Sequence, residues 1–404
     1  MPVIISQRAA VLRPSATFAM AARAAALRAE GRQVFDFSAG EPDFRPPTAV
    51  REAVASLVRE RAIGYTPVAG MLALREAVAE HLSHYHGTPI SPARVLVSNG
   101  AKHSIANLLQ AMIDPGDEVV IPTPAWVSYP DMVRLADGVP VVVPTSPEHG
   151  WRLQPDDLAR VVGPRTRLLV LNSPSNPTGG GYRAEDIAEI GAVLARHAPQ
   201  TCVMADDIYR RLTYAPFTHA SIVRVLGDVL ENLALVDGVS KTYAMTGFRI
   251  GFLVAAENVI TAATRVQGQT TSGAATPSQH GALAALRDPS VDAEVAAMHL
   301  AFTRRRATML AALGAIDGLR VVPPDGAFYA WVDASAYLGA TGLADDNALA
   351  QWLLDRHGVA SVPGSAFGGP GHIRLSYATD DDSVVQGCAR LAEAMSELAA
   401  RGAG

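Results

Sequence analysis

Between residues 94 and 254 the chain carries short apolar runs that end in small or polar residues, and helical stretches separate several of them. Apolar runs of about four to eight residues bounded by Gly, Pro, Asn or Asp are typical of buried strands. We expect strands over residues 95–97, 118–121, 139–143, 168–171, 202–205, 233–236 and 250–254. Strands alternating with helices favour an α/β fold with a parallel sheet, whose carboxyl edge presents the chemistry.

Two of these runs flank a polar segment, residues 237–249, that holds Lys241 and Arg249. A lysine becomes a good Schiff-base former when burial and nearby cations lower its pKa. Val239, Tyr243 and Met245 offer such an apolar setting. Taken by itself, a Ser-Lys pair in a loop is more often a solvated surface group, so the segment alone leaves both interpretations open.

A second candidate site is the turn of Gly100, Ala101 and Lys102, which follows the run at 95–97 and precedes a helix expected from His103. Small residues at a strand-to-helix turn leave the first helical N–H groups free for a phosphate, and the lysine adds charge. Glycine-bearing turns of this kind also occur without any ligand.

Three further side chains follow predicted strands. Trp126 offers a flat face for stacking on a heteroaromatic ring, or else packs in the core. Asn176 lies in an Asx-Pro turn that would hold its amide in one direction. Asp206 ends a buried run. An acidic residue at this position has three possible roles: a cap, a metal ligand or the partner of a pyridinium nitrogen.

Four longer motifs run in order along the chain: GEPDF (40–44), NSPSNPTG (172–179), SKTYAMTGFRIGF (240–252) and VPGSAFGGPGHIRLSYAT (362–379). In these motifs the chain resembles the class I (fold-type I) aminotransferases that use pyridoxal 5'-phosphate (PLP), in the bacterial aspartate/prephenate subgroup. The resemblance spans roughly residues 13–379. It implies a large PLP-binding domain over 46–285 with a mostly parallel seven-stranded sheet, and a smaller α/β domain formed by 1–45 and 286–404.

The resemblance also implies residue roles. Lys241 carries PLP, Asp206 faces its ring nitrogen, and Tyr209 and Asn176 bond its phenolic oxygen; Lys241, Asp206 and Tyr209 are the catalytic set. The other implied cofactor-binding residues are Gly100, Ala101, Lys102, Trp126, Ser240, Arg249 and, from the partner of a homodimer, Tyr65. The implied substrate-binding residues are Gly40, Trp126, Asn176 and Arg374, the last at the α-carboxylate. The chain departs from the family pattern at Phe248, usually Trp, and at Asp207, usually Glu.

The substrate is less constrained by the motifs. Ser15, Thr17 and Lys102 resemble the side-chain pocket of bacterial aspartate aminotransferases, and Arg13 occupies a position that is basic in relatives accepting prephenate. We expect a ping-pong transfer from an L-amino acid, foremost aspartate, to 2-oxoglutarate. The alternatives are prephenate or an aromatic amino acid as substrate, or a PLP-dependent lyase or synthase of the same fold.

Composition excludes several other classes of protein. The 404 residues are 49% hydrophobic with a net charge of −5, and no basic run favours nucleic acid or a membrane surface. We expect a cytoplasmic protein that acts on small molecules, with Cys202 and Cys388 as buried thiols. The cluster of His81, His84 and His86 suggests either a metal site or a solvated helix end, and we favour the helix end without a metal.

Overall fold

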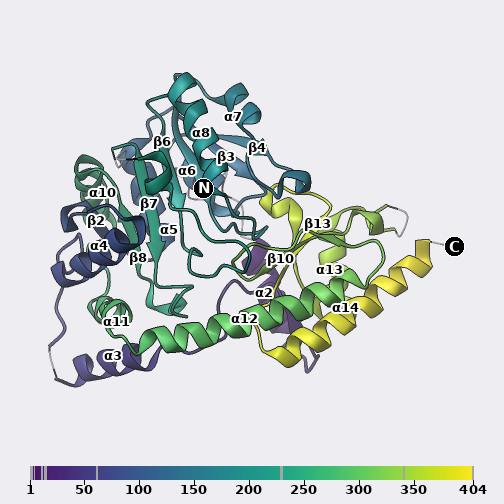
Figure 1. Cartoon of the computed structure of the whole chain (residues 1–404). Coiled ribbons are helices and arrows are strands. Elements are labelled where there is room, and N and C mark those ends of the chain that lie inside the picture. The colour runs from purple at the N-terminus through teal and green to yellow at the C-terminus, as the bar shows by residue number, and fades with distance from the viewer. Residues whose placement is uncertain are drawn as a thin grey trace.

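The computed structural model describes residues 3, 5–10, 12, 16–60, 62–227, 231–339 and 342–402. Within these residues one seven-stranded sheet forms the centre of the fold (Figure 1). Its strands are β2 (Val95–Ser98), β3 (Glu118–Thr123), β4 (Val139–Pro144), β5 (Thr166–Asn172), β6 (Cys202–Asp206), β7 (Leu233–Gly238) and β8 (Gly251–Val254). The strand order is β2-β8-β7-β6-β5-β3-β4. Only β8 runs antiparallel to its neighbours, which confirms the predicted mostly parallel sheet.

Both faces of this sheet are buried, because successive strand residues point into two different cores. Leu96 belongs to the core under α5 (Ala101–Met112), α6 (Ser128–Leu135) and α10 (Glu257–Thr270), whereas Val95 and Val97 belong to the opposite core. The helices that cover the opposite face are α3 (Thr48–Glu60), α4 (Leu72–His86), α7 (Pro155–Val161), α8 (Ala184–His197), α9 (Ile222–Leu226) and α11 (Thr276–Arg287). The result is a three-layer α/β arrangement.

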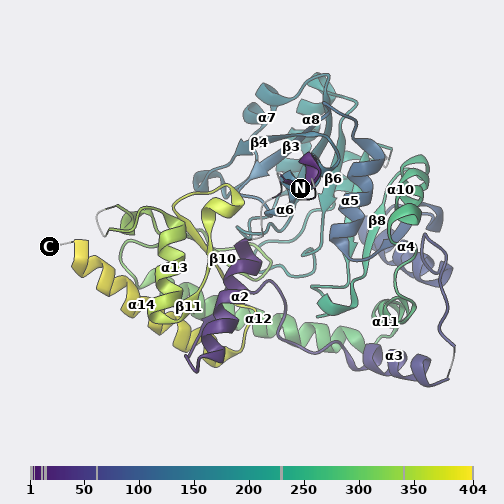
Figure 2. The same ribbon diagram turned by 180° about the vertical axis from the view of Figure 1, so that it is seen from behind.

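A smaller α/β unit packs beside the large sheet (Figures 1 and 2). Its strands are β9 (Arg320–Val321), β10 (Tyr329–Asp333), β12 (Val362–Pro363) and β13 (His372–Ser376), in the order β12-β13-β10-β9, and β1 (Phe35–Asp36) pairs with β11 (Val359–Ala360). The accompanying helices are α2 (Ala16–Ala29), α12 (Val291–Gly314), α13 (Asp346–His357) and α14 (Asp381–Gly402). The short helical segments are α1 (Gln7–Ala10) and the 3-10 turns Pro92–Arg94, Pro147–His149, Thr246–Phe248, Ser335–Tyr337 and Gly364–Phe367.

The long helix α12 links the two units. Val291 and Val295 at its start pack in the core of the large sheet, while Phe302 and Met309 further along pack with the small unit. The two cores therefore share one helix rather than meeting at a linker. The division of the chain at residues 46 and 286 stays a prediction.

Most predicted elements are present, but the helices α1, α6, α9 and α10 were not predicted, and α5 begins two residues earlier than expected, directly after Gly100. Cys202 and Cys388 are buried free thiols, as predicted. Among the described helices we find none with the length and apolarity that a membrane crossing requires.

The interpretation of the histidine cluster as a solvated helix end is wrong for His86. This side chain is 1% exposed and lies 2.8 Å from the Ser221 hydroxyl through its Nδ1 atom. It continues the buried stripe of Leu74, Val78 and Leu82 at a spacing of four residues along α4. Burial lowers the pKa of His86 to about 4. Within the described residues, no group of three or more metal-ligating side chains is present.

Candidate active site

The carboxyl edge of the large sheet gathers most of the predicted site residues. Strands β2, β3, β5, β6 and β7 all end at this edge, and β8 begins there because it runs the other way. The residues that follow or end these strands are Gly100, Ala101 and Lys102 after β2, Trp126 after β3, Asn176 after β5, Asp206 and Tyr209 at β6, and Ser240, Lys241 and Arg249 between β7 and β8.

Lys241 lies in the turn after β7 and is half-buried. Its Nζ atom donates to the carbonyl of Gly40 at 2.5 Å, which brings the GEPDF turn against the lysine. Burial is the main cause that lowers the pKa of Lys241 to about 8; the carboxylate of Glu41 opposes this shift, and the guanidinium groups of Arg374 and Arg249 add to it. A lysine with this pKa is partly neutral near pH 8 and can attack a carbonyl carbon.

Asp206 ends β6 and is 4% exposed. Tyr129 donates its hydroxyl to Asp206 Oδ2 at 2.6 Å, and Asn172 Nδ2 donates to the Asp206 carbonyl at 2.8 Å. Burial raises the pKa of the Asp206 carboxyl to about 6, against the opposing effect of the hydrogen bond from Tyr129. A buried carboxyl group fixed in this way is suited to pair with a protonated ring nitrogen.

The partner of Asp206, Tyr129, has no role in the sequence-based interpretation. The available signal is its spacing from Trp126: the two residues are three apart, and their rings make a T-shaped contact with centroids 5.2 Å apart. Trp126 lies just before α6 and Tyr129 lies in its first turn, so the two rings meet where the helix begins.

An anion cradle lies where α5 begins. The first N–H groups of a helix, here those of Ala101 and Lys102, have no acceptor inside the helix. Gly100 adopts a φ of +86°, and a Cβ atom added to it would lie 2.5 Å from Arg249 Nη2. A Cβ on Gly251 would come within 2.2 Å of the Ala101 nitrogen. Two glycines therefore let Arg249 and the start of α5 approach one another closely, as a phosphate site requires.

Lys102 and Trp126 lie on the side of this cradle. The Lys102 Nζ atom is 4.9 Å from the centroid of the Trp126 ring. Burial and the nearby Arg249 charge lower the pKa of Lys102. Trp126 itself is half-buried, which leaves part of the indole open.

Arg374, on β13, is a buried cation without a carboxylate partner in the described part of the chain. It is 2% exposed, and none of the salt bridges among the described residues includes it. Its Nη1 atom donates to Asn176 Oδ1 at 3.0 Å and its Nη2 atom to the Ser38 carbonyl at 2.7 Å. The Nε atom is buried without a hydrogen-bond partner in the same residues. A buried, incompletely paired guanidinium is suited to bind the carboxylate of a ligand.

The remaining predicted residues are not all brought to this edge within one chain. Tyr65 is fully exposed. Thr17 lies in the first turn of α2 and is half-buried. Its neighbour Ala16 packs on an apolar cluster that includes Phe367, which itself contacts Arg374. Arg13 and Ser15 lie outside the described residues.

The lysine content of the chain is a signal that the sequence-based interpretation does not use. Among 34 basic residues only two are lysines, Lys102 and Lys241, and both lie at this site. Arginine serves at every other basic position. An amine is retained where a compact, titratable nitrogen is needed, since a guanidinium cannot act as a nucleophile at neutral pH.

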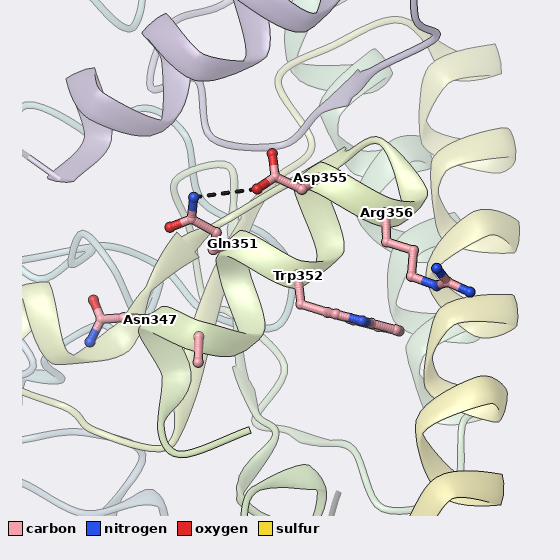
Figure 3. A pocket seen from close by; sticks show the side chains of 6 residues that line it. Asn347, Gln351, Trp352, Asp355 and Arg356 are labelled. Carbon is pink, nitrogen blue, oxygen red and sulfur yellow. Dashed lines mark hydrogen bonds between the residues drawn. The ribbon is translucent and has the colours of Figure 1, made fainter. Parts of the chain in front are cut away.

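An open groove on α13 is separate from this site. Asn347, Ala348, Gln351, Trp352, Asp355 and Arg356 line it, and Gln351 Nε2 donates to Asp355 Oδ2 at 3.3 Å (Figure 3). None of the predicted site residues lines this groove.

The fold and the lysine-bearing carboxyl edge are those of the PLP-dependent transferases of fold type I. The sequence profile of the family Aminotransferase class I and II matches residues 32–391. The chain is 40% identical over 399 residues to the bifunctional aspartate aminotransferase and glutamate/aspartate-prephenate aminotransferase of Petunia hybrida, covering 97% of this chain and 83% of the relative. It is 38% identical to the aspartate/prephenate aminotransferase of Nitrosomonas europaea, covering 97% and 100%.

A solved structure gives the same result. The aspartate aminotransferase of Thermus thermophilus with maleate superposes with a TM-score of 0.91 at 39% identity, covering 97% of this chain and 100% of that one. The chain belongs to the class I aminotransferases, as its motifs predict. It is a PLP-dependent aminotransferase.

The residues present fit that cofactor. PLP needs an amine for its aldehyde, an anion site for its phosphate and an acidic partner for its ring nitrogen. Lys241, the glycine-lined start of α5 with Arg249, and the buried Asp206 carboxyl offer these three groups at one edge.

Proposed function

We propose that this aminotransferase moves the amino group of L-aspartate to 2-oxoglutarate by a ping-pong mechanism. The observation that carries the proposal is Arg374, a buried guanidinium that no carboxylate in the described chain pairs. Both substrates are dicarboxylic acids, and Arg374 offers a planar fork for the α-carboxylate.

Lys102 supplies the second cation of this proposal. Its amine lies against the Trp126 ring, and its charge is suited to the distal carboxylate of aspartate or 2-oxoglutarate. We place Ser15 and Thr17 in the same side-chain pocket, with Arg13 as the basic residue that would favour prephenate. Gly40 borders the substrate, since its carbonyl already contacts Lys241.

Bound PLP supplies an electron sink for the pair left on the substrate Cα when its proton departs. Lys241 is the general base for that proton, because an amine with a pKa of about 8 both accepts and returns a proton near neutrality. Asp206, fixed by Tyr129, keeps the ring nitrogen protonated. Tyr209 and Asn176 donate to the phenolic oxygen; Arg374 occupies Asn176 Oδ1, which leaves the amide nitrogen free to donate.

The cofactor phosphate is assigned to Gly100, Ala101, Lys102, Ser240 and Arg249, and the ring face to Trp126. Ser240 is buried immediately before Lys241. These residues come from four segments of the sheet edge, namely the turns after β2, β3 and β7 and the residues just before β8.

We further propose a homodimer with shared active sites. Tyr65 is fully exposed beside the exposed Ile63, and Val58 and Leu72 are exposed on the adjoining helices α3 and α4. An exposed apolar patch of this kind favours burial against a second protein surface, and Tyr65 would then reach the partner's phosphate site. We also propose a cytoplasmic location, with which the two free thiols are consistent. The proposed domains are a large one over 46–285 and a small one formed by 1–45 and 286–404.

The test is a donor–acceptor panel on the purified protein with PLP, using aspartate, glutamate, phenylalanine, alanine and prephenate, with Lys241→Ala as the control. The proposal predicts the highest kcat/KM for aspartate with 2-oxoglutarate and no turnover in Lys241→Ala. Negligible activity with aspartate beside phenylalanine or prephenate would overturn the substrate assignment. Release of pyruvate or ammonia without amino transfer would favour a lyase.

A further inference from the structure

One tyrosine of the small unit contacts both halves of the active site. Tyr329 begins β10 and is 1% exposed. Its hydroxyl lies 2.9 Å from the hydroxyl of Tyr209, which follows β6 in the large sheet. A Cβ atom added to Gly40 would lie 3.2 Å from the same Tyr329 hydroxyl. The Tyr329 hydroxyl therefore lies between Tyr209 and the Gly40 segment, whose carbonyl accepts a hydrogen bond from Lys241.

The ring of Tyr329 lies under the substrate-binding guanidinium. The Arg374 Cζ atom is 4.4 Å from the centroid of this ring. The strand register explains the contact: Tyr329 pairs with Ser376, so Arg374 is its diagonal neighbour on the same face of the β10–β13 pair. One side chain thus presents its face to Arg374 and its hydroxyl to Tyr209.

The hydrogen bond between the two tyrosines has a direction that the chemistry sets. A phenol has one proton to donate. If Tyr209 donates its hydroxyl proton to the phenolic oxygen of the cofactor, then Tyr329 must be the donor in the hydrogen bond between the two tyrosines. Donation by Tyr329 polarises the Tyr209 hydroxyl and strengthens its own donation, because hydrogen bonds in a chain reinforce one another.

We infer that Tyr329 is a positioning residue, whose hydroxyl orients and polarises that of Tyr209 toward the cofactor. This inference rests on the proposed role of Tyr209 in the transaminase site. It assigns to the small unit an indirect effect on the cofactor, exerted through Tyr209, in addition to the proposed binding of substrate by Arg374.

The experiment compares Tyr329→Phe with Tyr377→Phe. Tyr377 is a matched control: it is fully buried in the same core, and its hydroxyl donates to the backbone carbonyl of Ala327 at 3.3 Å rather than to a predicted site residue. Each variant is loaded with PLP, and two quantities are measured: the pH midpoint of its visible absorbance and the steady-state constants with aspartate.

Tyr329→Phe keeps the ring under Arg374 and removes only the hydroxyl. We expect the pH midpoint to rise by about half a unit to one unit, since the phenolic oxygen loses part of its hydrogen bonding. We expect kcat to fall by about threefold to tenfold, with KM for aspartate within about twofold of wild type. Tyr377→Phe should leave the midpoint and both constants at their wild-type values, whatever it does to thermal stability.

A double-mutant cycle separates positioning from a general loss of packing. In a Tyr209→Phe background, adding Tyr329→Phe should move neither the midpoint nor kcat further. Additive effects in that background, or a Tyr329→Phe midpoint equal to that of Tyr377→Phe, would overturn the inference. Failure of the proposed function looks different: the wild-type protein itself would then form no visible chromophore with PLP or transfer no amino group.

Discussion

Replacing Arg374 by lysine tests how the site recognises a carboxylate. Two of the guanidinium N–H groups are already used inside the protein, on Asn176 Oδ1 and the Ser38 carbonyl, and the buried Nε atom has no partner among the described residues. Enough N–H donors of the guanidinium remain to bind two carboxylate oxygens at once. Arg374→Lys keeps the charge but offers a single ammonium in place of the fork.

The loss expected from Arg374→Lys is about one charge-assisted hydrogen bond to the substrate. Such a bond contributes about 1.5–3 kcal/mol, which corresponds to a decrease in kcat/KM of roughly 10- to 150-fold. Stopped-flow absorbance of the first half-reaction with aspartate measures this directly, because it isolates the amino donor from the acceptor.

Arg305→Lys provides the control for that experiment. Arg305 is also a buried arginine, but it bonds the carboxylates of Asp43 and Asp381 and so has a structural role. This variant should lose thermal stability while the KM for aspartate stays near wild type. A kcat/KM for Arg374→Lys within threefold of wild type would refute bidentate recognition of the substrate by Arg374.

Three further predictions concern the cofactor and the second cation. At a PLP concentration that saturates the variant, Lys102→Met should lower kcat/KM for aspartate by about tenfold or more while that for alanine changes little, since only aspartate has a distal carboxylate; the donor panel measures the ratio. Gly100→Ala should raise the dissociation constant of PLP by about tenfold, because the new Cβ atom would lie 2.5 Å from Arg249 Nη2 at a φ of +86°; titration of the apo-protein followed by absorbance checks it. Asp206→Asn should stabilise the apo-protein at pH 8. Burial raises the folded-state pKa of Asp206 from 3.8 to about 6, so its charge disfavours folding above pH 6 and has no effect below about pH 4. The free energy of unfolding of the variant should exceed that of wild type by at most about 3 kcal/mol at pH 8, and by nothing in acid. Denaturant unfolding at several pH values measures this difference, and a difference that does not depend on pH would contradict the prediction.

The strands and their polar ends could be predicted from the sequence because they are local patterns. The runs that become β5, β6 and β7 are apolar on both faces and end in Asn, Asp or Gly, and their common direction brings Asp206 and Lys241 to one edge. The roles of Asp206, Lys241 and Arg374 came from resemblance, because an acid, a lysine or an arginine at a strand end has several ordinary explanations.

Contacts between distant segments could not be predicted in the same way. Tyr129 and Asp206 are 77 positions apart in the sequence, and Tyr209 and Tyr329 are 120 apart. No local sequence pattern predicts either hydrogen bond. His86 shows the opposite case: its spacing from Leu82 places it on the buried stripe of α4, but its polarity favoured the wrong, solvated interpretation. In all three cases the packing of segments distant in the sequence determines where the side chain lies.

The most direct test of this account uses the scarcity of lysine in the chain. The wild-type protein is loaded with PLP, treated with borohydride, digested and analysed by peptide mass spectrometry. Of the two lysine side chains in the sequence, we predict that Lys241 alone carries the reduced pyridoxyl phosphate group and that Lys102 is unmodified. A label on Lys102, or a protein that takes up no label on either lysine, would contradict the assignment of Lys241 as the amine around which the active site is built.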